Sequence, residues 1–498
     1  MTETAPPQST DGPTPLFTSL SEALARRLPG FDELLDVERL SGGASQETYR
    51  LRLRRGGEET VLALRRAAGG AAAAGIEIDG EDRRPGLTVE ARIMQVAAAA
   101  GVPEPEVHLV LEPDDGLGEG FVMEWLDGET LGARIVRAPE LAEIRPHLAR
   151  QCGEILAAIH AIDPVETGLA PHLTALPTEE FVHLMWDEYK SLDSPQPMID
   201  YTARWLLDHL PPVGDHRLVH NDFRNGNLMI TPEGVTAVLD WEVAHLGDPM
   251  RDLGWICTRS WRFGRHDLPV GGFGHYDDLF AGYESVSGRP VDPTVVHFWE
   301  VFGSFWWAIG CLKMGDHWRH GPDPSVERPG IARRSSECQV DCVNLLIPGP
   351  VTPLVPADDR RSGDGTAERS STDLPTADEL LTSVTRFLRD DVMADTEGRT
   401  AFLARVAANS LDIVQRELAL GPLLRAGERA RLDALLGIGD GTELPLLDLR
   451  RRLVEAIRSG HLGLDDAAFQ EHLRTTVTHQ AGIDQPRYPG YELAVGET

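Results

Sequence analysis

The chain has 498 residues, of which 41% are hydrophobic and 25% charged, and its formal net charge is −32. This length exceeds one ordinary hydrophobic core, so we expect two or three packed units. This acidic composition disfavours nucleic acid and anionic membranes as partners, because proteins bind phosphate groups mainly through Lys and Arg.

The N-terminal residues, the cysteines and the single apolar stretch lead us to expect a cytoplasmic protein. Residues 1–18 are rich in Pro, Thr and Ser, so we expect a disordered tail, and they lack the basic and apolar regions of a signal peptide. The five cysteines are scattered, which is not the pattern of a disulfide framework. The stretch Phe298–Met314 is apolar but short and carries charges, so we interpret it as a buried helix and expect no membrane association.

Residues 19–124 have the pattern of a small sheet with one helix. Apolar runs on both sides of Gly56-Gly57 predict a β-hairpin. A helix is expected from Thr88 to Ala100, where a Gly and a Pro follow to end it. Phe121–Met123 predicts a further strand. We therefore treat residues 19–124 as an N-terminal lobe.

The rest of the chain is mainly helical, with one break. Residues 125–347 form a second lobe in this interpretation. Residues 348–375 carry many Pro, Gly, Ser and charged residues without an apolar period, which is typical of a linker. Residues 376–498 follow with repeated amphipathic patterns, and Thr376 with Glu379 predicts a capping box. We expect a small all-α domain there.

The segment around residues 218–240 carries the clearest chemical signal. Two apolar runs flank a turn at residues 231–234, which predicts a hairpin. Such a hairpin brings Asn227, before its first strand, next to Asp240, after its second, with Asp222 in the preceding loop. Mg²⁺ prefers oxygen ligands and takes only one or two from the protein in phosphate-transferring sites. We therefore predict Asn227 and Asp240 as Mg²⁺ ligands and Asp222 as the catalytic group that orients or deprotonates a hydroxyl. A polar loop with Asp and Asn serving turns is the alternative.

These residues carry a resemblance to a known family. His220-x-Asp222-x4-Asn227 followed by Asp240 resembles the catalytic and metal-binding segments of protein kinases and of aminoglycoside and choline phosphotransferases. The resemblance implies an α+β, bilobal protein-kinase-like fold, with a small antiparallel-sheet lobe and a mainly helical lobe, followed here by the all-α domain. It also implies ATP and Mg²⁺ as cofactors. Asn221 stands where protein kinases have Arg, which favours the small-molecule kinases.

The same resemblance implies a nucleotide site in the N-terminal lobe. Arg65 takes the place of the family's phosphate-binding Lys, and Glu90 on the next helix is placed to pair with it. Arg can hold phosphate oxygens but is not equivalent to Lys, and a surface Arg and Glu are the alternative. The other residues implied for nucleotide binding form the Gly-rich loop, the adenine-facing strand and the inter-lobe hinge: Ser41, Gly42, Gly43, Ala44, Ser45, Ala63, Glu124, Trp125 and Leu126.

Three further residues have open interpretations. Arg224 is predicted to contact the transferred phosphate, with a structural salt bridge as the alternative. Asp252 is expected to anchor the catalytic loop through hydrogen bonds. Arg262, next to Trp261, is a candidate anchor for a carboxylate or a phosphate of the acceptor.

The stretch Trp241–Gly264 narrows the resemblance to the phosphotransferase subfamily associated with acyl-CoA dehydrogenases, and the C-terminal block resembles an uncharacterised helical domain found beside such kinases. This implies phosphorylation of a small hydroxylated metabolite, such as a hydroxyacyl-CoA, and an acyl-CoA dehydrogenase-type partner. Two alternatives stay open. One is a catalytically weak nucleotide-binding protein that docks a partner enzyme, and the other is an aminoglycoside O-phosphotransferase.

Overall fold

The computed structural model describes residues 15–40, 46–68, 84–321, 324–355, 375–438 and 444–496. These residues form two compact units. The first contains the described residues up to Leu176 together with Gly214–Leu253 and Phe273–Val291. The second contains Pro177–Val213, Gly254–Gly272 and the described residues from Asp292 onward.

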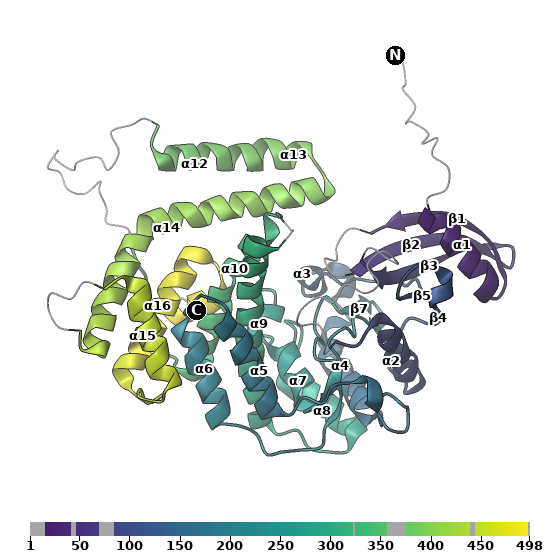
Figure 1. Ribbon diagram of the computed structural model, residues 1–498, viewed down its shortest axis with the longest axis horizontal. Coiled ribbons are helices and arrows are strands. Elements are labelled where there is room, and N and C mark those ends of the chain that lie inside the picture. The colour runs from purple at the N-terminus through teal and green to yellow at the C-terminus, as the bar shows by residue number, and fades with distance from the viewer. Residues whose placement is uncertain are drawn as a thin grey trace, which may run out of the picture. The chain divides into compact units, whose positions relative to one another are not determined.

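A five-stranded antiparallel sheet forms the start of the first unit (Figure 1). Its strands, in spatial order, are β1 (Phe31–Arg39), β2 (Gln46–Arg55), β3 (Glu58–Ala67), β5 (Gly120–Glu124) and β4 (Val107–Val110). The hairpin predicted at Gly56-Gly57 is confirmed, because Arg55 pairs with Glu58 across it. Both glycines have positive φ, 59° and 85°, as a two-residue hairpin turn requires.

Two helices accompany this sheet. In α1 (Pro15–Arg27) the residues Leu20, Ala23 and Leu24 are fully buried in one apolar cluster with β2 and β3. Residues 15–18, which we expected to be disordered, form the first turn of this helix, because its apolar face has the sheet to pack on. The helix predicted at Thr88–Ala100 is confirmed as α2 (Leu87–Ala99).

The remainder of the first unit joins helices to two small two-stranded sheets. Its helices are α3 (Gly132–Ile135), α4 (Arg145–Ala161) and α8 (Tyr276–Ser287). The small sheets pair β6 (Arg217–Val219) with β9 (His245–Gly247), and β7 (Leu228–Thr231) with β8 (Gly234–Val238). Helices α4 and α8 pack closely at Gly153, where an added Cβ would lie only 2.1 Å from the carbonyl oxygen of Leu279.

The second unit is helical and is built around a long apolar helix. Its first helices are α5 (Thr178–Ser191), α6 (Pro197–Asp208), α9 (Pro293–His320), α10 (Glu327–Arg333) and α11 (Ser335–Leu346); α7 (Met250–Cys257) begins in the first unit and ends here. Within the described part of the chain, α9 is the one helix long and apolar enough to cross a membrane. Of the most apolar 18-residue segment of α9, 67% is buried inside the protein. This agrees with the buried helix that we expected at Phe298–Met314.

The last helices belong to this same unit. They are α12 (Ala377–Arg386), the π-helical turn η6 (Phe387–Val392), α13 (Met393–Asp395), α14 (Gly398–Leu436), α15 (Leu446–Arg458), α16 (Ala467–Asp484) and α17 (Pro489–Val495). The capping box of Thr376 and Glu379 is confirmed at the start of α12. Figure 1 shows α12 and α13 beside the N-terminal half of α14, which bends before its C-terminal half. Pro422 lies within this helix, and a proline inside a helix removes a backbone hydrogen bond and causes such a bend.

The C-terminal helices share a hydrophobic core with α6 and α11. Met198 and Tyr201 of α6 and Val340 of α11 pack in one buried cluster with leucines of α15 and with Phe469 of α16. A buried carboxylate reinforces the junction, since Asp200 accepts a hydrogen bond from Arg458 Nε at 2.7 Å. Most of the predicted linker, residues 356–374, lies outside the described residues.

Candidate active site

The hairpin predicted at residues 231–234 forms, and it brings two of the candidate ligands together. Strands β7 and β8 pair from Leu228 with Val238 to Thr231 with Gly234. At the open end of the hairpin, the backbone N–H of Leu239 donates to the carbonyl oxygen of Asn227 at 2.8 Å. Asn227 and Asp240 therefore lie at adjacent positions on neighbouring chain segments, as the hairpin predicts.

Asp222 is held between two donors in the loop before this hairpin. Its Oδ2 accepts a hydrogen bond from Asn227 Nδ2 at 2.6 Å, and its Oδ1 accepts one from Arg224 Nε at 2.9 Å. These two bonds fix the orientation of the carboxylate, whose side chain is 17% exposed. The structure thus shows Arg224 in a salt bridge with Asp222, which is the alternative interpretation of this arginine.

The loop itself is anchored by a fully buried carboxylate, as we expected for Asp252. Asp252 accepts backbone hydrogen bonds from His220 at 2.9 Å and Asn221 at 2.7 Å. It also contacts His160 Nε2 at 3.0 Å. Burial alone would raise the pKa of Asp252, but the hydrogen bonds and the neighbouring histidines outweigh burial and lower it. The loop needs this support because Asn221 adopts a left-handed conformation, with φ of 66°.

Arg65 joins the N-terminal sheet to the hairpin. Its Nη1 lies 3.0 Å from Glu90 Oε1, which is the pairing that we predicted, and its Nη2 lies 2.5 Å from Asp240 Oδ1. Burial opposes a charged guanidinium, but Glu90 and Asp240 outweigh that effect and raise the pKa of Arg65. One permanently cationic side chain therefore bridges two carboxylates.

Burial is the main influence on the ionisation of Glu90. The side chain is 1% exposed, and burial raises the pKa of Glu90 to about 7 although Arg65 opposes the shift. The negative charges of Asp240 and Glu242 raise it further. Glu90 is therefore poised to change its protonation state near neutral pH.

Gln46 and Glu242 also belong to this site, and the sequence reasoning missed them. Gln46, at the start of β2, contacts Arg65 Nε through its side-chain oxygen and donates to Glu242 Oε2 at 3.4 Å. Burial and the charge of Asp240 raise the pKa of Glu242. The only signal available for Glu242 was its position two residues after Asp240.

Of the remaining predicted nucleotide-binding residues, the structure describes those on the strands and in the segment that follows β5. Ala63 is buried on β3 and pairs in register with Met123 of β5, next to Glu124 at the end of that strand. Trp125 and Leu126 follow directly, with Trp125 Nε1 bonded to Asp127 Oδ1 at 3.0 Å. The Gly-rich loop, residues 41–45 (Ser41, Gly42, Gly43, Ala44 and Ser45), lies outside the described residues.

Asn227 and Asp240 fit the requirements of a divalent cation. Asn227 donates through its Nδ2 to Asp222, which leaves Oδ1 as the end of the amide that can face a cation. Asp240 uses Oδ1 for Arg65 and has its second oxygen for a metal. In the described part of the chain no three His, Cys, Asp or Glu side chains form a metal-binding group. A cation here would complete its shell with phosphate and water, as Mg²⁺ does.

Arg262 has a role that differs from the one we expected. It is 4% exposed, and its Nη2 lies 2.6 Å from Glu300 Oε1 and 2.7 Å from the carbonyl oxygen of Cys257. The guanidinium is thus neutralised by a buried carboxylate, so the prediction of an anchor for an acceptor anion is wrong. The partner stands 38 positions away, beyond the reach of local sequence reasoning.

Comparison with solved structures identifies the same architecture elsewhere. A protein from Ralstonia eutropha, named as a candidate aminoglycoside phosphotransferase, superposes with a TM-score of 0.53 over 66% of this chain and 97% of its own, at 23% identity. At that identity the likeness shows the fold alone. It confirms the predicted α+β, bilobal kinase-like fold. The C-terminal helices that we expected after this fold are present as α12 to α17.

Curated relatives align with about half of the chain. Acyl-CoA dehydrogenase family member 10 of Mus musculus is 30% identical over 244 residues, which are 46% of this chain and 20% of the relative. Acyl-CoA dehydrogenase family member 11 of Gallus gallus is 30% identical over 256 residues, which are 48% of this chain and 30% of the relative. The chain therefore spans only about a fifth to a third of the length of these relatives.

Two family models match the chain at separate positions. Residues 394–488 match a domain of unknown function, DUF6285. Residues 36–288, which contain Arg65, Glu90, Asp222, Asn227 and Asp240, match the model of the phosphotransferase enzyme family, APH. Because this match covers half of the chain and all the residues that converge in the first unit, the protein belongs to the phosphotransferase enzyme family.

Proposed function

We propose that this protein is a small-molecule kinase that transfers the γ-phosphate of ATP to a hydroxyl group. The observation that carries the proposal is the convergence of Asp222, Asn227 and Asp240 at one hairpin, with Arg65 reaching Asp240 from the opposite sheet. Phosphoryl transfer depends mainly on positioning and on cations that neutralise the phosphates, and this site supplies both.

Asn227 and Asp240 would hold Mg²⁺ in this proposal. The metal would neutralise charge on the phosphates of ATP when bound. Arg65 would add a fixed positive charge beside the same phosphates, and its ion pair with buried Glu90 keeps the guanidinium in place. The Gly-rich loop, Ala63 and the segment Glu124–Leu126 would bind the rest of the nucleotide.

Asp222 would act on the acceptor. Its carboxylate accepts the hydroxyl proton while the hydroxyl oxygen forms a bond to the γ-phosphorus and the bond from that phosphorus to the β-phosphate oxygen breaks, releasing ADP. The hydrogen bonds from Asn227 and Arg224 orient the carboxylate for this step. In this proposal Arg224, now paired with Asp222, would also contact the transferred phosphate.

For the acceptor, we propose a hydroxyacyl-CoA or a closely related hydroxylated thioester. The support is that relatives named as acyl-CoA dehydrogenase family members align with about half of this chain at 30% identity. The same relationship supports an acyl-CoA dehydrogenase-type enzyme as a partner of the protein. An amino sugar is a less favoured acceptor, since the solved structure with that name supports the fold alone.

The test measures ADP release by the purified protein with ATP and Mg²⁺, in the presence of hydroxyacyl-CoAs, amino sugars or amino alcohols. We expect turnover with a hydroxyacyl-CoA, loss of turnover in Asp240→Ala, and retention in Asp277→Ala, an exposed carboxylate in the first turn of α8. Binding of ATP without ADP release for any acceptor would instead favour a nucleotide-binding protein without catalysis.

A further inference from the structure

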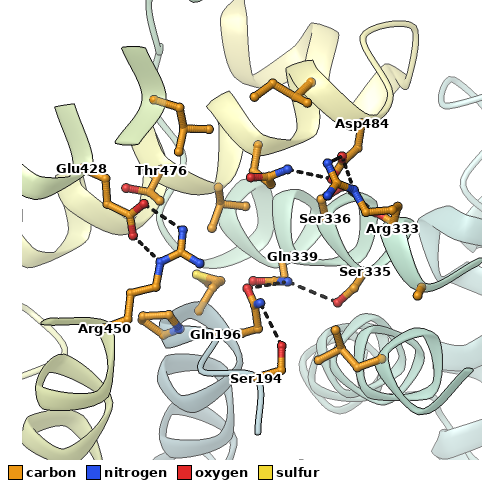
Figure 2. Close-up of a pocket in the computed structure, with 18 of the residues that line it drawn as sticks. Ser194, Gln196, Arg333, Ser335, Ser336, Gln339, Glu428, Arg450, Thr476 and Asp484 are labelled. Carbon is orange, nitrogen blue, oxygen red and sulfur yellow. Dashed lines mark hydrogen bonds and ion pairs between the residues drawn. The ribbon is translucent and has the colours of Figure 1, made fainter. Parts of the chain in front are cut away.

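A cavity of about 600 Å³ lies inside the second unit, and none of the candidate active-site residues lines it (Figure 2). Its walls come from α6, α9, α10 and α11 on one side and from α14, α15 and α16 on the other. The last three helices carry most of the match to the domain of unknown function. The volume is that of a typical pocket for a small organic ligand.

Two groups of ion pairs stand on different walls of the cavity (Figure 2). Arg450 forms two bonds to Glu428, at 2.5 and 2.7 Å. Arg333 lies 2.7 Å from Asp484 Oδ1 and 2.7 Å from Glu417 Oε2. Each of these three carboxylates therefore contacts a guanidinium group, with Arg333 shared between Asp484 and Glu417.

Between the ion pairs runs a row of uncharged polar side chains. Gln339 Nε2 donates to Ser335 Oγ at 3.2 Å and lies 3.5 Å from Gln196 Oε1. Gln196 Nε2 in turn donates to Ser194 Oγ at 3.4 Å (Figure 2). These bonds are long compared with the usual 2.9 Å, so the amides have capacity for a better placed partner.

His472 lines the cavity and has a buried nitrogen without a partner. The residue is 1% exposed, and its Nδ1 has no hydrogen-bond partner among the described residues. Burial, with the nearby charges of Arg431 and Arg450, lowers the pKa of His472 to about 3. The imidazole is therefore neutral near pH 7 and can accept or donate one hydrogen bond. A buried polar atom left unpaired is costly unless something else binds it.

The cavity is also lined by two arginines that form no ion pair with a carboxylate of the described residues. Arg319 of α9 and Arg425 of α14 are exposed lining residues, and neither has an ion pair or side-chain hydrogen bond among the described residues. Arg425 lies over Gly421, where a Cβ would come within 2.8 Å of its Nη1, so the glycine at the bend of α14 gives the guanidinium its place. In a chain of net charge −32, two guanidinium groups at one cavity without a carboxylate partner among the described residues indicate an anionic ligand.

We propose that this cavity binds a small organic anion, whose carboxylate or phosphate group contacts Arg319 and Arg425 and whose uncharged polar part contacts Gln339, Gln196 and His472. Such a ligand bridges the helices of the C-terminal block and α6 of the phosphotransferase match. Binding therefore stabilises the second unit. The site does not depend on the proposed kinase activity.

The test uses probes of matched shape and different charge. N-acetylphenylalanine carries a carboxylate, phenethyl phosphate carries a phosphate, and N-acetylphenylalaninamide is neutral. Thermal unfolding and isothermal titration are measured with the full chain in the absence of ATP. We expect at least one anionic probe to raise the Tm and the neutral amide to leave it unchanged, because a ligand that binds only the folded state stabilises it. The better of the two anions tells whether the site prefers carboxylate or phosphate.

The double variant Arg319→Gln with Arg425→Gln tests the placement. We expect it to weaken anion binding roughly tenfold or more, since charge-assisted hydrogen bonds are lost. Its control is Arg405→Gln with Arg452→Gln, which removes two exposed arginines of α14 and α15 that do not line the cavity. The isosteric variant Gln339→Met tests the interior and is expected to weaken binding severalfold.

Three results would overturn the proposal. One is that neither anionic probe shifts the Tm at 10 mM, a concentration at which about millimolar affinity is detected. Another is that the Arg319 and Arg425 double variant and the control variant bind the anions equally. Binding that is lost in Arg65→Met but kept in the Arg319 and Arg425 double variant would place the anion in the phosphate site of the first unit, and so also contradict this cavity as the site.

Discussion

Arg65 and Asp240 form an ion pair between a strand of the N-terminal sheet and the end of the β7–β8 hairpin, with Nη2 2.5 Å from Oδ1. The same guanidinium also pairs with Glu90. A lysine has one ammonium group, whereas the planar guanidinium can contact two carboxylates at once. The arginine at this position therefore connects the phosphate side of the proposed site to its metal side.

We predict that Arg65 is needed for catalysis. Arg65→Met should lower kcat/KM about 100-fold, because a fixed positive charge beside the phosphates is lost. Arg65→Lys should recover part of the activity, since it restores the charge but not the second contact. Steady-state ADP release checks both variants, with Arg52→Met, an exposed arginine of β2, as the control. Equal kcat/KM for the wild type and Arg65→Met would contradict the role.

The buried Glu90 predicts a pH dependence of activity. The pKa of Glu90 is raised to about 7, so the carboxylate loses its charge as pH falls from 8 to 6. Loss of that charge removes one partner of Arg65, and kcat/KM should fall over this range. Glu90→Gln cannot titrate and should have a lower and flatter pH profile. An acid limb that is unchanged in Glu90→Gln would assign the pH dependence to another group.

Asp252 should be essential for the loop that presents Asp222. Asp252→Ala removes the acceptor of two backbone N–H groups and the partner of His160, all in a buried place. We expect a loss of roughly 3–5 kcal/mol in the free energy of unfolding. Denaturant unfolding measures the loss, and Asp277→Ala serves as an exposed control. The milder Asp252→Asn should keep the fold and lower kcat, so a variant with unchanged kcat and stability would contradict an anchoring role.

We predict that the buried, neutral His472 makes the folded protein less stable as pH falls. Its pKa is lowered from 6.5 to about 3 by burial first and then by nearby arginines, so the folded protein keeps it neutral. A depressed pKa contributes stability that is present above the unfolded pKa and is lost as pH falls toward the folded value. Between pH 7 and pH 5 the loss is on the order of 2 kcal/mol.

Chemical denaturation at the two pH values measures this effect. In His472→Gln the fall in the free energy of unfolding between pH 7 and pH 5 should be smaller by that amount than in the wild type. Equal pH dependence for the two proteins would mean that His472 is charged in the folded state or is not buried there.

How much of the site could be predicted depended on distance along the chain. Asn227 and Asp240 could be placed together because one short hairpin separates them. The pairing of Arg65 with Glu90 followed from a strand and the next helix of one small lobe. Each of these predictions needed only local geometry and a familiar order of elements.

The parts that could not be predicted depend on tertiary packing. His160 meets Asp252 from 92 positions away, and Gln46 meets Glu242 from 196 positions away. In the sequence, Arg262 is recognisable only as an arginine beside an aromatic residue. Its contact with Glu300 is seen only in the folded protein. The cavity is formed by seven helices, and no local pattern brings α6 next to α16.

The most direct test of the proposed chemistry is the turnover of Asp222→Ala, measured as ADP release with a hydroxyacyl-CoA acceptor, alongside its affinity for ATP with Mg²⁺ by isothermal titration. Asp222 contacts the acceptor hydroxyl in this account, whereas Asn227, Asp240 and Arg65 hold the nucleotide. We therefore predict ATP binding close to that of the wild type and a turnover lower by roughly 10²–10⁴-fold. Turnover equal to that of the wild type would contradict the account.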